Sequence, residues 1–191
     1  RAELQEMKLP FEEVDDPSSC AADLIANGKI IGWFQGRMEA GARALGNRSI
    51  LANPRMAEMK DIVNAYVKHR EPFRPFAPAI LVERVGAYFD DTLPVPFMER
   101  VFDVRKERRA DIPAVTHVDG TGRLQTVSQE QNPRFYKLIQ AFEQRTGVPV
   151  VLNTSFNIRG EPIVCTPADA IRCFYSTGMD ALILDRFLLK K

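Results

Sequence analysis

Residues 29–50 read KIIGWFQGRMEAGARALGNRSI, and this stretch sets the fold expected for the whole chain. Its first part, Lys29–Gln35, is apolar with β-branched residues, which predicts a buried strand. Its second part, Gly36–Ile50, holds three arginines, three glycines and one carboxylate, Glu39. Glycine lets a backbone approach a ligand closely, and arginine offers a planar fork of donors to phosphate or carboxylate. The stretch therefore predicts an anion site at the end of a strand, although a loop with scattered surface arginines is the alternative.

Predicted strands and helices alternate along the rest of the chain. Strands are expected at residues 29–35, 49–52, 79–82, 97–104, 115–118, 123–127, 148–152 and 181–189. Helices are expected at 20–27, 39–45, 83–89, and after the Asn-Pro or Thr-Pro pairs at 53–54, 132–133 and 166–167. A turn at Asp119–Gly122 predicts a hairpin between 115–118 and 123–127. We therefore expect an α/β or α+β fold with a mixed sheet.

Length, charge and cysteine content narrow the function. The 191 residues fit one domain or two small ones, and 26 basic against 25 acidic residues leave a net charge of +1. That balance argues against bulk binding of nucleic acid or of a membrane surface. The three cysteines are far apart, which indicates reduced thiols in a cytoplasmic protein, and no signal peptide or apolar span is evident. Two histidines and no carboxylate cluster predict no metal site.

Four segments combine cationic or small hydrogen-bonding residues with turn chemistry: Gly36–Ile50, Lys68–Pro78, Thr116–Val127 and Asn153–Gly160. A polyphosphate site needs converging cations and neutral donors. The candidates are Arg43, Lys68, Arg70, Arg74, Arg123, Asn153, Thr154 and Ser155, with Arg37 and Arg48 as support for the loop. Neither common phosphate loop, GxxxxGK[ST] or GxGxxG, is present. The residues thus predict an arginine-rich phosphate or carboxylate site without naming a reaction.

Several candidates could also have a purely structural role instead of binding a ligand. Arg74 lies between two aromatic residues and could stack on them, and Asn153–Ser155 could be a turn that caps its own backbone. For His117 we favour a half-buried, satisfied histidine over a catalytic one, because no partner is visible in the sequence.

Four motifs together carry a family resemblance. GRMEAGARALGNRS (36–49), KHREPFRPFAP (68–78), HVDGTGRLQTV (117–127) and LNTSFNIRGEPIV (152–164) closely resemble the C-terminal domain of the O-carbamoyltransferases that modify nodulation factors and antibiotics. The resemblance runs from about Ser18 to Leu189. It implies a YrdC-like fold, an open twisted mixed sheet with flanking helices. On this basis residues 1–17 are expected to be a lead-in from an N-terminal domain, and residues 18–191 the C-terminal domain.

The resemblance also implies a reaction. The domain would take carbamoyl phosphate and ATP with Mg²⁺ as substrates and form carbamoyl adenylate, releasing phosphate and pyrophosphate. An N-terminal Kae-like domain of the same polypeptide, which carries an iron site, would then pass the carbamoyl group to an acceptor hydroxyl. Two alternatives remain: a nucleotide- or RNA-binding module without chemistry, and a domain that is inactive unless docked to its partner.

Family roles transfer to this chain position by position. Arg43 would bind phosphate, Lys68 and Arg74 would hold the nucleotide and carbamoyl phosphate, and Arg123 would face carbamoyl phosphate or the nascent carbamate. Asn153 and Ser155, with Thr154 between them, would donate hydrogen bonds to phosphate oxygens. Arg70 and His117 complete the set, in which the expected catalytic residues are Lys68, His117 and Arg123.

Overall fold

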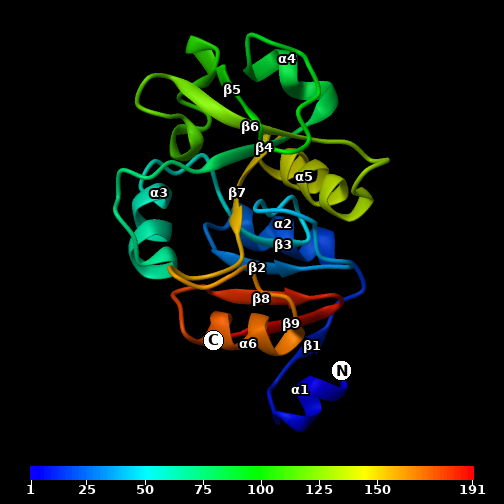
Figure 1. The fold of residues 1–191 in the computed structure, drawn as a ribbon. Helices are drawn as coiled ribbons and strands as arrows, with labels where there is room; N and C mark the ends of the chain where they lie inside the picture. The colour runs from blue at the N-terminus through cyan, green and yellow to red at the C-terminus, as the bar shows by residue number, and fades with distance from the viewer.

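A computed structural model describes residues 1–191, whose strands form one nine-stranded sheet (Figure 1). The strands are β1 (Glu12–Glu13), β2 (Ile31–Phe34), β3 (Arg48–Ala52), β4 (Ala77–Leu81), β5 (Arg100–Asp103), β6 (Thr121–Val127), β7 (Val150–Ser155), β8 (Ala181–Leu184) and β9 (Phe187–Lys190). Their order is β1-β9-β8-β2-β3-β7-β4-β6-β5. The pairs β2–β8 and β4–β6 are parallel and the others antiparallel, which confirms the predicted mixed sheet.

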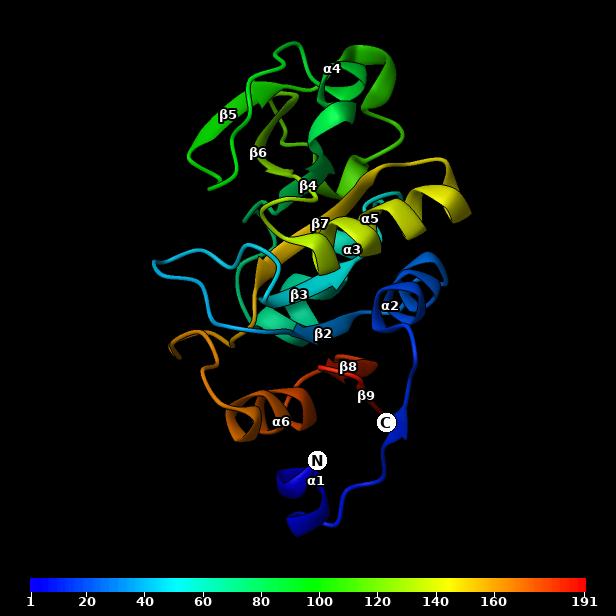
Figure 2. The same cartoon turned by 90° about the vertical axis from the view of Figure 1, so that its right-hand side faces the viewer.

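Helices cover both faces of this sheet. They are α1 (Ala2–Glu6), α2 (Pro17–Ala26), α3 (Met59–Ile62), α4 (Val85–Tyr88), α5 (Pro133–Thr146) and α6 (Pro167–Tyr175), with a π-helix η1 (Val63–Lys68) and the 3₁₀ turns η2 (Val82–Arg84), η3 (Lys106–Arg108) and η4 (Pro113–Val115). Helices α2 and α5 lie side by side on one face and α6 lies on the other (Figure 2). Every residue of β2, β3 and β4 is buried, as expected for strands covered on both sides.

Local sequence signals explain where the long helices begin. The side chain of Asn132 accepts from the backbone N–H of Phe135 at the start of α5, and proline follows at the first helical position. Thr166 and Asp169 form the predicted capping box of α6. The predicted apolar face of α5 is buried, and its members are Phe135, Leu138, Ile139 and Phe142. These helices therefore follow from capping chemistry and hydrophobic periodicity.

Two predicted elements are wrong. Residues 39–45 form no helix, because the Glu39 carboxylate binds the backbone N–H groups of Leu45 and Asn47 in an open loop. Residues 115–118 form no strand, because His117 closes a tight turn with Gly120 and Thr121. Strand β6 pairs instead with β5, so the predicted hairpin is replaced by a longer connection.

Two further predictions need adjustment. Asn53 accepts from the N–H of Arg55, and this turn delays the helix so that α3 begins only at Met59. The last predicted strand is a hairpin of β8 and β9, because Asp185 adopts a left-handed conformation (φ 55°) between them.

Residues 1–17 carry α1 and β1, and β1 pairs with β9. None of the helices has the length and apolarity needed to cross a membrane.

Candidate anion-binding site

The sheet register brings two predicted site residues to the same place. Strand β4 lies between β6 and β7, with Ala79 opposite Gln125 and Ala77 opposite Asn153. Arg123 precedes Gln125 by two residues and therefore projects from the same face of β6. The amide of Asn153 donates to Gln125 Oε1 over 2.7 Å, so these two side chains meet. Asn153 and Arg123 therefore lie on the same face of the sheet.

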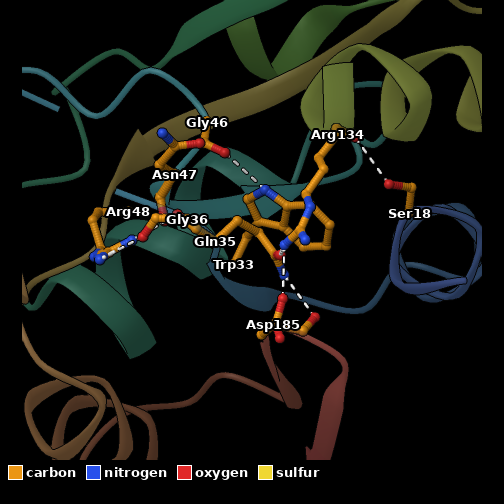
Figure 3. A network of polar contacts seen from close by, with 9 residues as sticks. All are labelled: Ser18, Trp33, Gln35, Gly36, Gly46, Asn47, Arg48, Arg134 and Asp185. Atoms are coloured by element: carbon orange, nitrogen blue, oxygen red, sulfur yellow. Dashed lines mark hydrogen bonds and ion pairs between the residues drawn. The ribbon is translucent and has the colours of Figure 1, made fainter. Parts of the chain in front are cut away.

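The loop between β2 and β3 supplies another wall, and it projects away from α2 and α5 (Figure 2). Arg48 clamps its two ends, donating to the carbonyl oxygens of Gln35 (2.8 Å), Gly36 (3.2 Å) and Asn47 (3.0 Å). Trp33 Nε1 donates to the carbonyl of Gly46 over 2.8 Å (Figure 3). The interpretation of Arg48 as support for the loop is confirmed, and the clamped loop presents Arg43 to the sheet.

The network extends from the loop to helices α5 and α2 on one face of the sheet and to the turn between β8 and β9 (Figure 3). Arg134 of α5 donates to Gln35 Oε1 over 2.8 Å and to Asp185 Oδ1 over 2.7 Å, and its carbonyl accepts from Ser18 of α2. Gln35 Nε2 in turn donates to the Asp185 carbonyl over 2.9 Å. The base of the loop is therefore tied to α5, to α2 and to the β8–β9 turn.

A small cavity of about 90 Å³ lies where loop and sheet meet. Six of the predicted site residues line it: Arg43, Arg70, Arg123, Asn153, Thr154 and Ser155. Three guanidinium groups thus converge, and no carboxylate is part of the lining. This is the arrangement that attracts a phosphate or carboxylate group.

The arginines of this cavity differ in what they already bind. The side chains of Arg43 and Arg123 make no hydrogen bond and no ion pair, and Arg123 Nε is buried without a partner. Arg70 donates from Nε to Asn64 Oδ1 over 2.7 Å and lies 4.7 Å from the ring centre of Phe76.

Burial lowers the pKa of Arg123, and the charge of Arg43 adds to that effect. Burial also lowers the pKa of Arg70, followed by the charges of Arg74 and Arg123. The cavity therefore carries positive charge that nothing inside it compensates.

Lys68 lies behind this cavity at the end of η1 and is only 4% exposed. Its Nζ donates to Asn157 Oδ1 (2.6 Å), the Asn157 carbonyl (2.8 Å) and the Ser155 carbonyl (2.9 Å). Burial lowers the pKa of Lys68 to about 7, and the nearby charge of Arg70 adds to this effect. Its ammonium group therefore holds the bend that follows β7, next to the cavity-lining Ser155.

Besides Lys68, two predicted residues lie outside the cavity lining. Arg74 pairs with Glu71 over 3.0 Å at the surface. His117 lines a neighbouring groove, where its Nδ1 lies 3.0 Å from Thr121 Oγ1. Burial lowers the pKa of His117, so its ring is neutral at pH 7.

Sequence reasoning missed two residues of the site. Asn157 is the main partner of Lys68, and its only sequence signal is its position two residues after Ser155 at the end of β7. Gln125 joins Asn153 to the loop, because its Nε2 donates to the Leu45 carbonyl over 2.9 Å. Asn153 Nδ2 donates to Gln125 and to the Ala44 carbonyl, so in this structure its N–H groups hold the loop.

No group of three or more His, Cys, Asp or Glu side chains is placed to hold a metal ion.

The sequence is similar to a nodulation protein and to a cephem O-carbamoyltransferase. Nodulation protein NolO of Bradyrhizobium diazoefficiens is 52% identical over 186 residues, which cover 96% of this chain and 34% of that protein. The 3'-hydroxymethylcephem-O-carbamoyltransferase of Amycolatopsis lactamdurans is 39% identical over 160 residues, which cover 84% of this chain and 30% of that enzyme. The chain thus spans about a third of the length of these relatives.

Solved structures confirm the fold. Full-length HypF in its phosphate- and nucleotide-bound form matches 95% of this chain and 23% of its own, with a TM-score of 0.60 and 18% identity. Sua5 of P. abyssi in complex with L-threonine matches 90% of this chain and 48% of its own, with a TM-score of 0.65 and 16% identity. These likenesses establish the YrdC-like fold, and residues 22–191 match the family model described as "Carbamoyltransferase C-terminus". The chain therefore belongs to the carbamoyltransferase C-terminus family.

Proposed function

We propose that this domain forms carbamoyl adenylate from carbamoyl phosphate and ATP. One observation carries the proposal: three guanidinium groups line a cavity that contains no carboxylate, and those of Arg43 and Arg123 have no partner in the protein. Carbamoyl phosphate and the triphosphate of ATP are both compact anions that such a cavity attracts. Membership of the carbamoyltransferase family supplies the carbamoyl group as the chemical context.

The proposed reaction has two steps. Water adds to the carbonyl carbon of carbamoyl phosphate, which releases inorganic phosphate and leaves carbamate. A carbamate oxygen then attacks the α-phosphorus of ATP, which forms carbamoyl adenylate and releases pyrophosphate. Negative charge accumulates on oxygen in both steps, and preplaced cations stabilise it without a nucleophilic side chain. Closure of the site around carbamate would protect this unstable intermediate from water.

The side chains divide this work according to their present partners. Arg43 and Arg123 are free to bind oxygens of the substrates, and Arg70 faces the same cavity. Lys68 adds positive charge from behind Ser155 and keeps that wall in place. Because the lining offers no carboxylate ligand, Mg²⁺ would enter with the phosphates of the nucleotide.

We further propose that the carbamoyl group leaves this domain for an acceptor hydroxyl bound elsewhere in the polypeptide. The two relatives are about three times as long as the matched region, so most of each protein lies outside it. A Kae-like domain with an iron site, as the resemblance implies, would fill that role and choose the acceptor.

Pyrophosphate release provides the test. The chain is incubated with ATP and Mg²⁺, with and without carbamoyl phosphate, and both phosphate and pyrophosphate are measured. We expect pyrophosphate only when both substrates are present, in equal amounts with the phosphate released from carbamoyl phosphate. Calorimetric titration with each substrate serves as the control for binding. A folded chain that binds both substrates and releases no pyrophosphate would contradict independent catalysis.

A further inference from the structure

The first step of the proposed reaction needs a proton acceptor, and the anion cavity contains none. Water that attacks a carbonyl carbon must lose a proton as the new bond forms. The cavity lining offers guanidinium groups, which keep their protons at neutral pH, and amides and hydroxyls, which are not bases. The ammonium group of Lys68 is occupied by oxygens of Ser155 and Asn157. A base must therefore come from beside the cavity.

His117 lies on the cavity face of strand β6. Its Nδ1 is 3.0 Å from the hydroxyl oxygen of Thr121. Thr121 and Arg123 are two residues apart in β6, so their side chains project from the same face at a spacing of about 7 Å. The groove that His117 lines also shares Pro75 and Phe76 with the anion cavity. The imidazole ring therefore lies next to Arg123 at the edge of the cavity.

Hydrogen bonding determines which nitrogen of His117 is free. The hydroxyl of Thr121 donates to Asp119 Oδ1 over 2.7 Å, so its oxygen accepts from Nδ1–H of His117. With Nδ1 protonated and the ring neutral, Nε2 is an acceptor. This Nε2 is buried and has no partner in the protein. His117 thus keeps one basic nitrogen available beside the cavity.

The surroundings of His117 suit a group that takes up a proton and releases it again. Burial lowers the pKa of His117 below its ordinary value near 6.5, and the charges of Arg123 and Lys60 add to this effect. The carboxylate of Asp119 opposes them and would stabilise the protonated ring. It is fixed in place because it also accepts from the backbone N–H of Thr121 over 3.0 Å. The chain Asp119–Thr121–His117 therefore orients the ring as the third member of a catalytic triad orients its base.

We propose that His117 is the general base that activates water for attack on carbamoyl phosphate. Its Nε2 removes a proton from water while the water oxygen bonds to the carbonyl carbon. The bond from this carbon to the bridging oxygen then breaks, and its electron pair leaves with the phosphate. His117 returns its proton to the departing phosphate, and the carbamic acid loses a proton to solvent to become carbamate. The inference rests on the proposed use of carbamoyl phosphate, but it concerns this step alone.

Supplying carbamate directly bypasses the step assigned to His117. Freshly dissolved ammonium carbamate replaces carbamoyl phosphate, and pyrophosphate release from ATP with Mg²⁺ is measured with either substrate. The variant His117→Asn keeps a donor for Thr121 in place of Nδ1–H and removes Nε2. We expect it to lower pyrophosphate release from carbamoyl phosphate by about 10²–10⁴-fold and to leave release from carbamate at the wild-type level.

The matched control is His69→Asn, which replaces the other histidine of the chain. His69 is exposed, and its left-handed backbone (φ 46°) is one that asparagine tolerates. The control should alter release from neither substrate.

A pH profile of the wild type gives a second measurement that needs no variant. The rate with saturating carbamoyl phosphate should fall as the pH drops through the pKa of His117, below 6.5, because a protonated Nε2 cannot accept. Arg123, Lys60 and Asp119, which act on the ring, keep their charges down to about pH 5. Lys68, with a pKa of about 7, gains positive charge in this range and would raise the rate. A rate that stays constant or rises down to about pH 5 would contradict the assignment.

The two substrates also separate the failures. Equal losses from carbamoyl phosphate and carbamate in His117→Asn would indicate a structural role and overturn the assignment, as would full activity with both. Phosphate release from carbamoyl phosphate is followed in the same reactions. If it depends on His117 but pyrophosphate never appears, the proposed function fails and the general base stands. If carbamate alone yields pyrophosphate in the wild type, the water step and the role of His117 fall together.

Discussion

Arg48 and Arg123 are both strand arginines whose pKa is lowered by burial, yet their surroundings differ. The Nε atom of each is buried without a partner. The terminal nitrogens of Arg48 donate to three backbone carbonyls, and its guanidinium lies 3.5 Å from the ring centre of Phe34. The terminal nitrogens of Arg123 bind no protein atom, and its surroundings include two further arginines. The difference separates an arginine that shapes the loop from one that is left for a ligand.

Replacement of Arg123 should have the largest effect. We expect Arg123→Ala to lower kcat/KM for carbamoyl-phosphate-dependent pyrophosphate release by about 10²–10³-fold, the cost of removing one preplaced donor from a developing charge. Its thermal unfolding midpoint should stay the same or rise, because an uncompensated buried charge is removed. Arg100→Ala, on the exposed neighbouring strand β5, is the matched control and should be neutral in both assays. Loss of stability with Arg123→Ala would place Arg123 in the same class as Arg48.

Arg48→Ala should lower stability more than it lowers activity, the opposite of Arg123→Ala. We expect the free energy of unfolding to fall by about 2–3 kcal/mol, because three carbonyl groups lose a charged donor. Urea denaturation measures this loss. Substrate binding should weaken only in the fraction of molecules whose loop, which carries Arg43, has become disordered. An Arg48→Ala variant of unchanged stability that no longer binds substrate would erase the distinction between the two arginines.

The pH dependence of anion binding should give the smallest effect. Sulfate is a suitable probe, since its charge is constant above pH 5. Burial lowers the pKa of Lys68 to about 7, so Lys68 is charged below pH 7 and loses its proton above it. Sulfate binding should therefore weaken between pH 6.5 and 8.5. Because a single proton is coupled to binding, the dissociation constant can rise by at most about tenfold per pH unit.

Neighbouring groups titrate outside that window. Burial lowers the pKa of His117 below its ordinary value near 6.5 and raises the pKa of Cys173 to about 11. Lys68→Met removes the titrating group at similar length, and its sulfate binding should be weak and independent of pH. The same slope in wild type and Lys68→Met would show that another group titrates.

Prediction from the sequence succeeded where local chemistry and periodicity decide the outcome. The alternation of strands and helices gave the mixed sheet, and Asn132 and Thr166 marked the starts of α5 and α6. The sequence predicts that the segments around Arg43, Arg70, Arg123 and Ser155 form one site, and the structure brings those side chains to one cavity.

The remaining errors arise from contacts between residues that are distant along the chain or from side chains that bind backbone. Nothing in the sequence shows that Glu39 binds two backbone N–H groups and prevents a helix, or that β6 pairs with β5. Asn157 was missed because its role depends on Lys68, which is 89 positions away. Whether an arginine meets carbonyls, as Arg48 does, or meets nothing, as Arg123 does, is decided by tertiary packing alone.

The π-helix η1 has a consequence for how this segment can change in length. A π-helix holds more residues in each turn than an α-helix, and η1 ends at Lys68, directly before the left-handed His69 (φ 46°). A π turn holds about one residue more than an α turn, so deleting one residue from Val63–Lys68 and forming an ordinary α-helix would leave the lysine at nearly the same angle around the axis. If all six residues formed an α-helix, the lysine would instead turn by about 100°, and its ammonium group would lie out of phase with Ser155 and Asn157 although every residue that binds it was still present. The wide turn, and not only the identity of its residues, is thus a requirement of the site.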